Sequence, residues 1–245
     1  HLSKQTFQDF EVIVVDGQSE DKTVELAKTF TSNLPKLTTL TSDRRHVCTQ
    51  RNLGAKHAIG EVLIFSDADN QLPNYFLQGI KYRWETSSSD LLSCWFKPDI
   101  SNPQNDSIAL AINMFMEIQN NIKPTYLIEG LIVINKSCFN KIGGFDESVN
   151  FAEGKNLIKS INNLGYKYTI VKDPTYIMSF RRYRKFGILG LASRTAKLEL
   201  SSLFNSKTDP KQLYPMNGGT ILKNSKNRNK FQKNISKLLQ KLQEL

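Results

Sequence analysis

Two short apolar runs in this 245-residue chain each stop abruptly at aspartates. Residues 10–15 (FEVIVV) are rich in β-branched side chains and are followed at once by Asp16. Residues 62–65 (VLIF) end in a polar cluster that contains Asp67 and Asp69. Apolar runs of this length, bounded by turn residues, are typical of strands that are buried in a sheet. We therefore predict two core strands with carboxylates at their carboxyl ends.

The segments between these runs follow a regular order. Residues 23–30 and 47–59 read as helices and residues 37–41 as a strand, so the chain begins strand, helix, strand, helix, strand. This order is typical of a parallel sheet that is covered by helices on both faces. The carboxyl ends of parallel strands meet at one edge of the sheet, where ligands bind in such folds. We therefore expect the aspartates after the first and third strands to face one crevice.

Asp67 and Asp69 are candidates for a metal site. Two carboxylates one residue apart can hold a divalent cation such as Mg²⁺ through oxygen ligands. The alternative is a solvated turn, because aspartate and asparagine are common turn residues. The sequence has no G-x-G-x-x-G segment after a strand and no G-x-x-x-x-G-K-[ST] segment. A dinucleotide-binding fold and a P-loop NTPase are therefore disfavoured.

Further helices and strands are expected up to about residue 180. Helices are predicted at residues 73–85, 107–121, 136–142 and 155–163, and strands at residues 91–96, 127–134 and 168–171. We therefore expect an α/β domain over residues 1–180, with a mostly parallel sheet flanked by helices.

The positive charge is concentrated after this domain. Residues 1–180 contain 18 lysine and arginine residues against 20 aspartate and glutamate residues, whereas residues 181–245 contain 15 against 3. We expect residues 181–245 to form a basic helical extension. Its charge favours an anionic partner such as a membrane surface, and a solubilising surface is the alternative. Nucleic acid is disfavoured, because the extension lacks interleaved aromatic residues and any known binding motif.

Apolar patterns in the extension predict two helices. Residues 186–204 contain too many charges for a membrane span, and we expect them to lie on a membrane surface or to pack on the body. Residues 231–245 place an apolar side chain at every third or fourth position, which is typical of a coiled-coil seam.

The three cysteines have no zinc spacing and no disulfide framework, so a cytoplasmic setting is the default. Together with the basic extension, this predicts a cytoplasmic protein with peripheral contact at the inner face of a membrane.

Several motifs occur in a fixed order along the chain. They are residues 5–7 (QTF), 11–23 (EVIVVDGQSEDKT), 50–55 (QRNLGA), 60–70 (GEVLIFSDADN), 142–147 (IGGFDE) and 164–167 (LGYK). In this order they resemble the family 2 glycosyltransferases, over about residues 2–187. The resemblance implies the GT-A fold, a Rossmann-like α/β architecture that binds a nucleotide sugar.

The resemblance also implies roles for individual residues. Asp16 would hydrogen-bond the nucleotide base or ribose, and Arg51 would lie against the nucleotide. Asp67 would face the ribose or the waters around a metal ion and is a second candidate metal ligand. Asp69 would bind Mg²⁺ or Mn²⁺ on the diphosphate. The metal would offset the charge that develops on the leaving nucleoside diphosphate.

Arg181 and Arg182 stand where related proteins place basic residues near the diphosphate. A guanidinium fork suits phosphate oxygens, so the resemblance makes both arginines candidate nucleotide-sugar ligands. The alternative is that they simply begin the basic extension.

Two features depart from the family pattern. Related proteins begin with a further strand, central to the sheet, before the equivalent of Leu2. The nucleotide site would then be completed by residues upstream of His1 or would be incomplete. Related proteins also carry Glu-Asp at the start of the acceptor-side helix, where the aspartate acts as general base. This chain has Glu153 and Gly154 at these two positions.

Glycine cannot accept a proton, and loss of a general base costs about 10²–10⁴-fold in rate. Glu153 is therefore the candidate catalytic residue. The expected function is inverting, metal-dependent transfer of a sugar from a UDP- or GDP-sugar to a hydroxyl of a glycan, a lipid-linked acceptor or a protein. The alternative is a degenerate member of the family that binds a nucleotide sugar or a glycan without catalysis.

Overall fold

The computed structural model describes residues 1–149, 152–187, 190, 193–194 and 197. The chain divides into two units, His1–Phe180 and Arg181–Leu245. The strands of the first unit are β1 (Val12–Asp16), β2 (Leu37–Thr41), β3 (Val62–Ser66), β4 (Leu91–Pro98), β5 (Leu131–Asn135) and β6 (Tyr168–Met178). Its α-helices are α1 (Thr23–Lys28), α2 (Val47–His57), α3 (Phe76–Ser87), α4 (Pro103–Ile122), α5 (Lys136–Lys141) and α6 (Glu153–Asn163).

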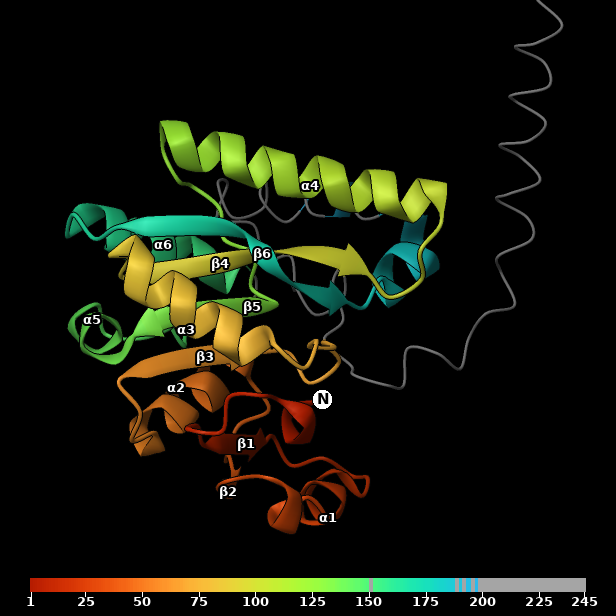
Figure 1. Cartoon of the computed structure of the whole chain (residues 1–245), viewed down its shortest axis with the longest axis vertical. Coiled ribbons are helices and arrows are strands. Elements are labelled where there is room, and N and C mark those ends of the chain that lie inside the picture. The colour runs from red at the N-terminus through yellow and green to blue at the C-terminus, as the bar shows by residue number, and fades with distance from the viewer. Residues whose placement is uncertain (150–151, 188–189, 191–192, 195–196, 198–245) are drawn as a thin grey trace, which may run out of the picture. The chain divides into compact units, whose positions relative to one another are not determined.

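The described strands form two sheets, which Figure 1 shows with β1 and β2 at one end and α4 at the other. β1 and β2 pair in parallel. The second sheet has the order β3-β5-β4-β6, in which β5 is antiparallel to both of its neighbours and β4 is parallel to β6. The α/β class is confirmed. The sheet pairing, however, is a mixture of parallel and antiparallel strands.

The expected continuation from β2 to β3 in one parallel sheet was wrong. β3 pairs antiparallel with β5, so that Ser66 lies opposite Leu131. β5 buries four consecutive side chains and therefore takes an interior place in the sheet, next to β3. The start of β5 thus lies beside the end of β3, where Asp67 and Asp69 follow.

Three element boundaries differ from the sequence prediction by four residues or more. β6 continues to Met178, because it stays paired with β4 beyond a register shift between Cys94 and Phe96. α4 begins at Pro103, because the Asn102 side chain caps it by accepting a hydrogen bond from the Asn105 amide over 2.9 Å. β5 begins at Leu131, because the side chains of Arg51 and Asn70 bond the backbone carbonyls of the two residues before it.

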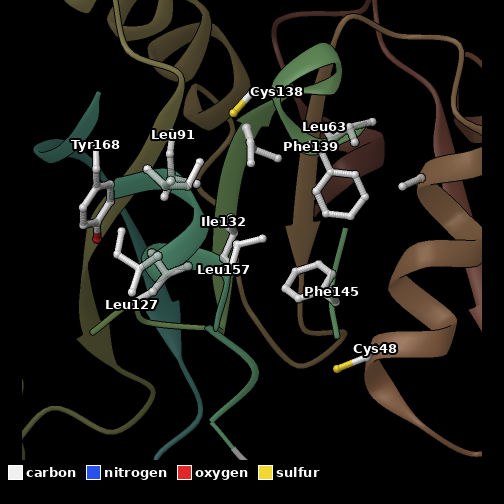
Figure 2. Packing of buried hydrophobic residues seen from close by; sticks show 14 residues of the cluster. Cys48, Leu63, Leu91, Leu127, Ile132, Cys138, Phe139, Phe145, Leu157 and Tyr168 are labelled. Atoms are coloured by element: carbon white, nitrogen blue, oxygen red, sulfur yellow. The ribbon is translucent and has the colours of Figure 1, made fainter. Parts of the chain in front are cut away.

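A hydrophobic core cluster joins buried residues of all four strands of the second sheet to helices α2, α5 and α6. Figure 2 shows Phe139 close to Phe145 in this core, and their ring centroids are 5.5 Å apart. The same figure shows Leu127 beside Leu157 of α6. This packing fixes the chain before β5 against the first turns of α6.

Cys48, Cys94 and Cys138 are buried free thiols. Among the described residues, no helix has the length and apolar character needed to cross a bilayer. The expected helix over residues 186–204 is described only in part, and the expected seam over residues 231–245 lies outside the described residues.

Candidate active site

The loop after β3 brings two carboxylates to the start of β5. The Asp67 amide donates to the Gly130 carbonyl over 3.0 Å, and the Asn70 amide donates to the Asp67 carbonyl over 3.1 Å. The Asn70 side chain also donates to the Gly130 carbonyl. These bonds tie a turn that contains Asp69 to the residues before β5. The turn therefore has a fixed position at the sheet edge.

Arg51 of α2 connects this turn to the chain before β5. Its Nη2 donates to Asp67 Oδ1 over 3.1 Å and to the Glu129 carbonyl over 2.8 Å. Its guanidinium carbon lies 5.3 Å from the centroid of the Phe145 ring, within the range of a cation–π contact. Among the described residues, the buried Nη1 has no hydrogen-bond partner. Arg51 thus lies next to the candidate metal ligand Asp67, and its Nη1 group can still donate a hydrogen bond.

Two glutamates, Glu129 and Glu153, lie close together near Arg51. Glu153, the first residue of α6, is only 2% exposed, whereas Glu129 is partly exposed. Burial raises the pKa of Glu129 well above its usual range, and a hydrogen bond with Glu153 and the charge of Glu153 raise it further. The Gly154 amide donates to Glu129 Oε1 over 2.6 Å, which opposes this rise. The two carboxyl groups therefore form a close pair at the start of α6.

Asn52, next to Arg51, holds the loop that contains Phe145. Its Nδ2 donates to the Phe145 carbonyl and its Oδ1 accepts from the Phe145 amide, both over 2.9 Å. Nδ2 also donates to Glu147 Oε1 over 2.9 Å. Hydrogen bonds from Asn52 and Thr49 and the nearby charge of Arg44 lower the pKa of Glu147. The Phe145 ring beneath Arg51 is thus positioned from the same helix as Arg51.

Asp16 lies at the end of β1 in the other sheet and is buried. Its Oδ2 accepts a hydrogen bond from the Ser19 amide over 3.0 Å. Gln50, the residue before Arg51, donates to the Val15 carbonyl over 3.3 Å. α2 therefore touches the ends of both β1 and β3. The expectation that Asp16 and Asp67 share a sheet edge was wrong, and α2 connects their two strands instead.

Arg181 and Arg182 belong to the second unit, whereas the other residues of the candidate active site belong to the first. The structure does bring together Arg51, Asp67 and Glu153, through Glu129. The sequence prediction missed Glu129 and Asn52. Asn52 follows Arg51 within the motif at residues 50–55 (QRNLGA), and Glu129 is an acidic residue within the mainly apolar predicted strand at residues 127–134. Both were signals that could have identified these residues.

The donor set fits a cation that binds together with a diphosphate. Among the described residues, no cluster of three or more His, Cys, Asp or Glu side chains could hold a metal ion by itself. Mg²⁺, however, commonly binds through one or two carboxylates, with substrate phosphates as further ligands. Asp67 and Asp69, which stand one residue apart after β3, are the carboxylates that would fill this role.

A separate hollow of about 360 Å³ opens between the loop at Gly143-Gly144 and α6. Asp146, Asn156 and Lys159 are among its lining residues, whereas Asp67, Arg51 and Glu129 are not. The hollow is therefore not formed by the carboxylates of the candidate active site.

Known proteins resemble this chain in sequence and in fold. An uncharacterized glycosyltransferase of Bacillus subtilis, YfnE, is 37% identical over 62 residues, which are 25% of this chain and 16% of YfnE. Staphylococcus aureus TarS, residues 1–349 in complex with UDP, superposes with a TM-score of 0.56 at 20% identity, over 86% of this chain and 62% of the other. The mannosyltransferase PcManGT of Pyrobaculum calidifontis, in complex with GDP-mannose and Mn²⁺, gives a TM-score of 0.58 at 19% identity, over 79% and 57% of the two chains.

This chain spans about a sixth of the length of YfnE and about three fifths of the TarS 1–349 chain. At identities near 20%, the two superpositions establish a shared fold. The family model for glycosyl transferase family 2 matches residues 1–143, which is more than half of the sequence and includes β1, β3 and Arg51. The chain therefore belongs to glycosyl transferase family 2.

Proposed function

We propose that this chain transfers a sugar from a UDP- or GDP-linked donor to an acceptor hydroxyl, with inversion at the anomeric carbon and with Mg²⁺ or Mn²⁺. One observation supports this most strongly. Arg51 joins Asp67, at the end of β3, to the chain that contains Glu129. Candidate donor-side and acceptor-side carboxylates are thereby adjacent. TarS structures with UDP and with UDP-GlcNAc, and the PcManGT structure with GDP-mannose and Mn²⁺, share the fold.

In this proposal Asp69 and Asp67 hold the cation, which neutralises charge on the leaving diphosphate. Asp16 and Arg51 bind the nucleotide, and the family resemblance makes Arg181 and Arg182 further candidate ligands of the diphosphate. The acceptor is a glycan, a lipid-linked molecule or a protein. The cytoplasmic setting and the contact of residues 181–245 with an anionic membrane belong to the same proposal, because of the charge of that segment.

Calorimetry tests the donor side. UDP-GlcNAc and GDP-mannose are titrated into the full chain with Mn²⁺ and with EDTA. We expect one of them to bind, and binding to weaken by roughly tenfold or more without the metal. Asp69→Asn should remove the metal dependence, whereas Asp9→Asn, at an exposed aspartate of the N-terminal segment, should keep it. Metal-independent binding, or no binding, would contradict the proposal.

A degenerate, binding-only protein is the second candidate, because Gly154 stands where the family pattern has its general base. Sugar-nucleotide hydrolysis and transfer are compared between the natural chain and Gly154→Asp. Turnover that arises only in Gly154→Asp would favour the binding-only function. Turnover in the natural chain would exclude it.

A further inference from the structure

Glu129 occupies the space that a side chain at position 154 would need. A β-carbon built on Gly154 would lie 3.0 Å from both Cγ and Oε1 of Glu129, and 3.1 Å from Cβ of Leu127. These distances are shorter than ordinary van der Waals contacts. The Glu129 carboxylate also accepts the Gly154 amide hydrogen bond. A carboxylate is therefore present at the start of α6, although it comes from another part of the chain.

We infer that Glu129 is the general base of the transfer, at the place that the family pattern gives to residue 154. This inference rests on the proposed function. The acceptor oxygen forms a bond to the anomeric carbon, and its proton goes to the Glu129 carboxylate. The bond from the anomeric carbon to the diphosphate oxygen breaks, and its electron pair stays on that oxygen. Glu129 afterwards releases the proton to solvent.

The backbone of Glu129 is held beside the candidate donor site. Its carbonyl accepts from Arg51 Nη2, which also donates to Asp67 Oδ1. The next residue, Gly130, accepts from the Asp67 amide. A β-carbon on Gly130 would be 3.8 Å from Asp67 Oδ2, so the two segments are in contact. Glu129 is therefore next to the residues expected to hold the diphosphate.

Exposure distinguishes Glu129 from Glu153. Glu129 is partly exposed, whereas Glu153 is buried. Among the described residues, Glu153 Oε1 has no hydrogen-bond partner. Glu153 is then the buried neighbour of the base.

The first experiment compares Glu129→Gln with the matched variant Glu153→Gln. Both substitutions keep the size of the side chain and remove its charge. Release of nucleoside diphosphate is measured with the sugar nucleotide that binds the natural chain, and binding of that sugar nucleotide is measured by calorimetry. We expect Glu129→Gln to lower turnover by about 10²–10⁴-fold while the donor still binds, and Glu153→Gln to lower it by less than roughly tenfold. A normal rate in Glu129→Gln, or an equal loss in Glu153→Gln, would overturn the assignment.

The second experiment moves the carboxylate and needs no donor for its first readout. Gly154→Asp should lower the melting temperature, because its side chain meets Glu129, and the double variant Glu129→Ala/Gly154→Asp should recover part of the loss. The double variant should also turn over roughly tenfold or more faster than Glu129→Ala alone. A stable Gly154→Asp variant, or a folded double variant that binds donor without this gain, would overturn the inference. Absence of donor binding by the natural chain would instead refute the proposed function.

Discussion

Asn52→Ala tests whether α2 positions the loop beneath Arg51. The substitution removes two hydrogen bonds to the backbone of Phe145 and one to Glu147. A neutral hydrogen bond contributes about 1 kcal/mol net, so the two backbone bonds contribute about 2 kcal/mol. Because the Glu147 side chain is 39% exposed, its bond is screened by water, and we count it as about 0.5–1 kcal/mol. The expected loss of unfolding free energy is therefore about 3 kcal/mol.

Chemical denaturation of the full chain, monitored by fluorescence and by circular dichroism, measures this loss. A protein of this size should also melt about 6–12 °C lower. Asn156→Ala is the matched control, since Asn156 donates one exposed side-chain bond, to Asp146, and its loss should cost under about 1 kcal/mol. If Asn52→Ala and Asn156→Ala lower stability equally, Asn52 does not hold the Phe145 loop.

Three further predictions concern other parts of the chain. Gly144→Ala should destabilise the protein by about 1–3 kcal/mol more than Gly143→Ala. Both glycines have positive φ angles, but only at Gly144 would a β-carbon meet a side chain of α2, since it would lie 2.7 Å from Asn52 Oδ1. Equal denaturation midpoints of the two variants would refute this prediction. Because the pKa of Glu147 is lowered, its charged form stabilises the fold above pH 4.5, and this stabilisation is lost as the pH falls through the folded-state pKa. The difference in unfolding free energy between the natural chain and Glu147→Gln should therefore become smaller in acid. A difference that does not change with pH would contradict the prediction. The full chain should float with phosphatidylglycerol vesicles through residues 181–245 and should be released by high salt, and equal flotation with phosphatidylcholine vesicles would count against an electrostatic contact.

The sequence predicted those elements whose signal is local. The apolar runs at residues 10–15 and 62–65 became β1 and β3 with shifts of at most two residues. The helix predicted at residues 47–59 became α2, Val47–His57. A buried strand or an amphipathic helix is recognisable over about ten residues, because the period of its side chains follows from its own backbone.

Strand pairing was not predictable in the same way. β3 pairs with β5, and Arg51 bonds a carbonyl 78 residues away. The strand predicted at residues 168–171 continues as β6 to Met178, because it stays paired with β4. Such contacts depend on which distant surfaces bury one another, and the local pattern contains no information on that choice.

The sequence by itself determined the α/β class, the order of the motifs and the aspartates that end β1 and β3. It also showed that position 154 is a glycine. Only the tertiary structure decided which carboxylate lies at that position, because Glu129 reaches Gly154 across 25 residues of chain. The backbone hydrogen bond and the packing of Leu127 against α6 create this proximity, and both require the folded core.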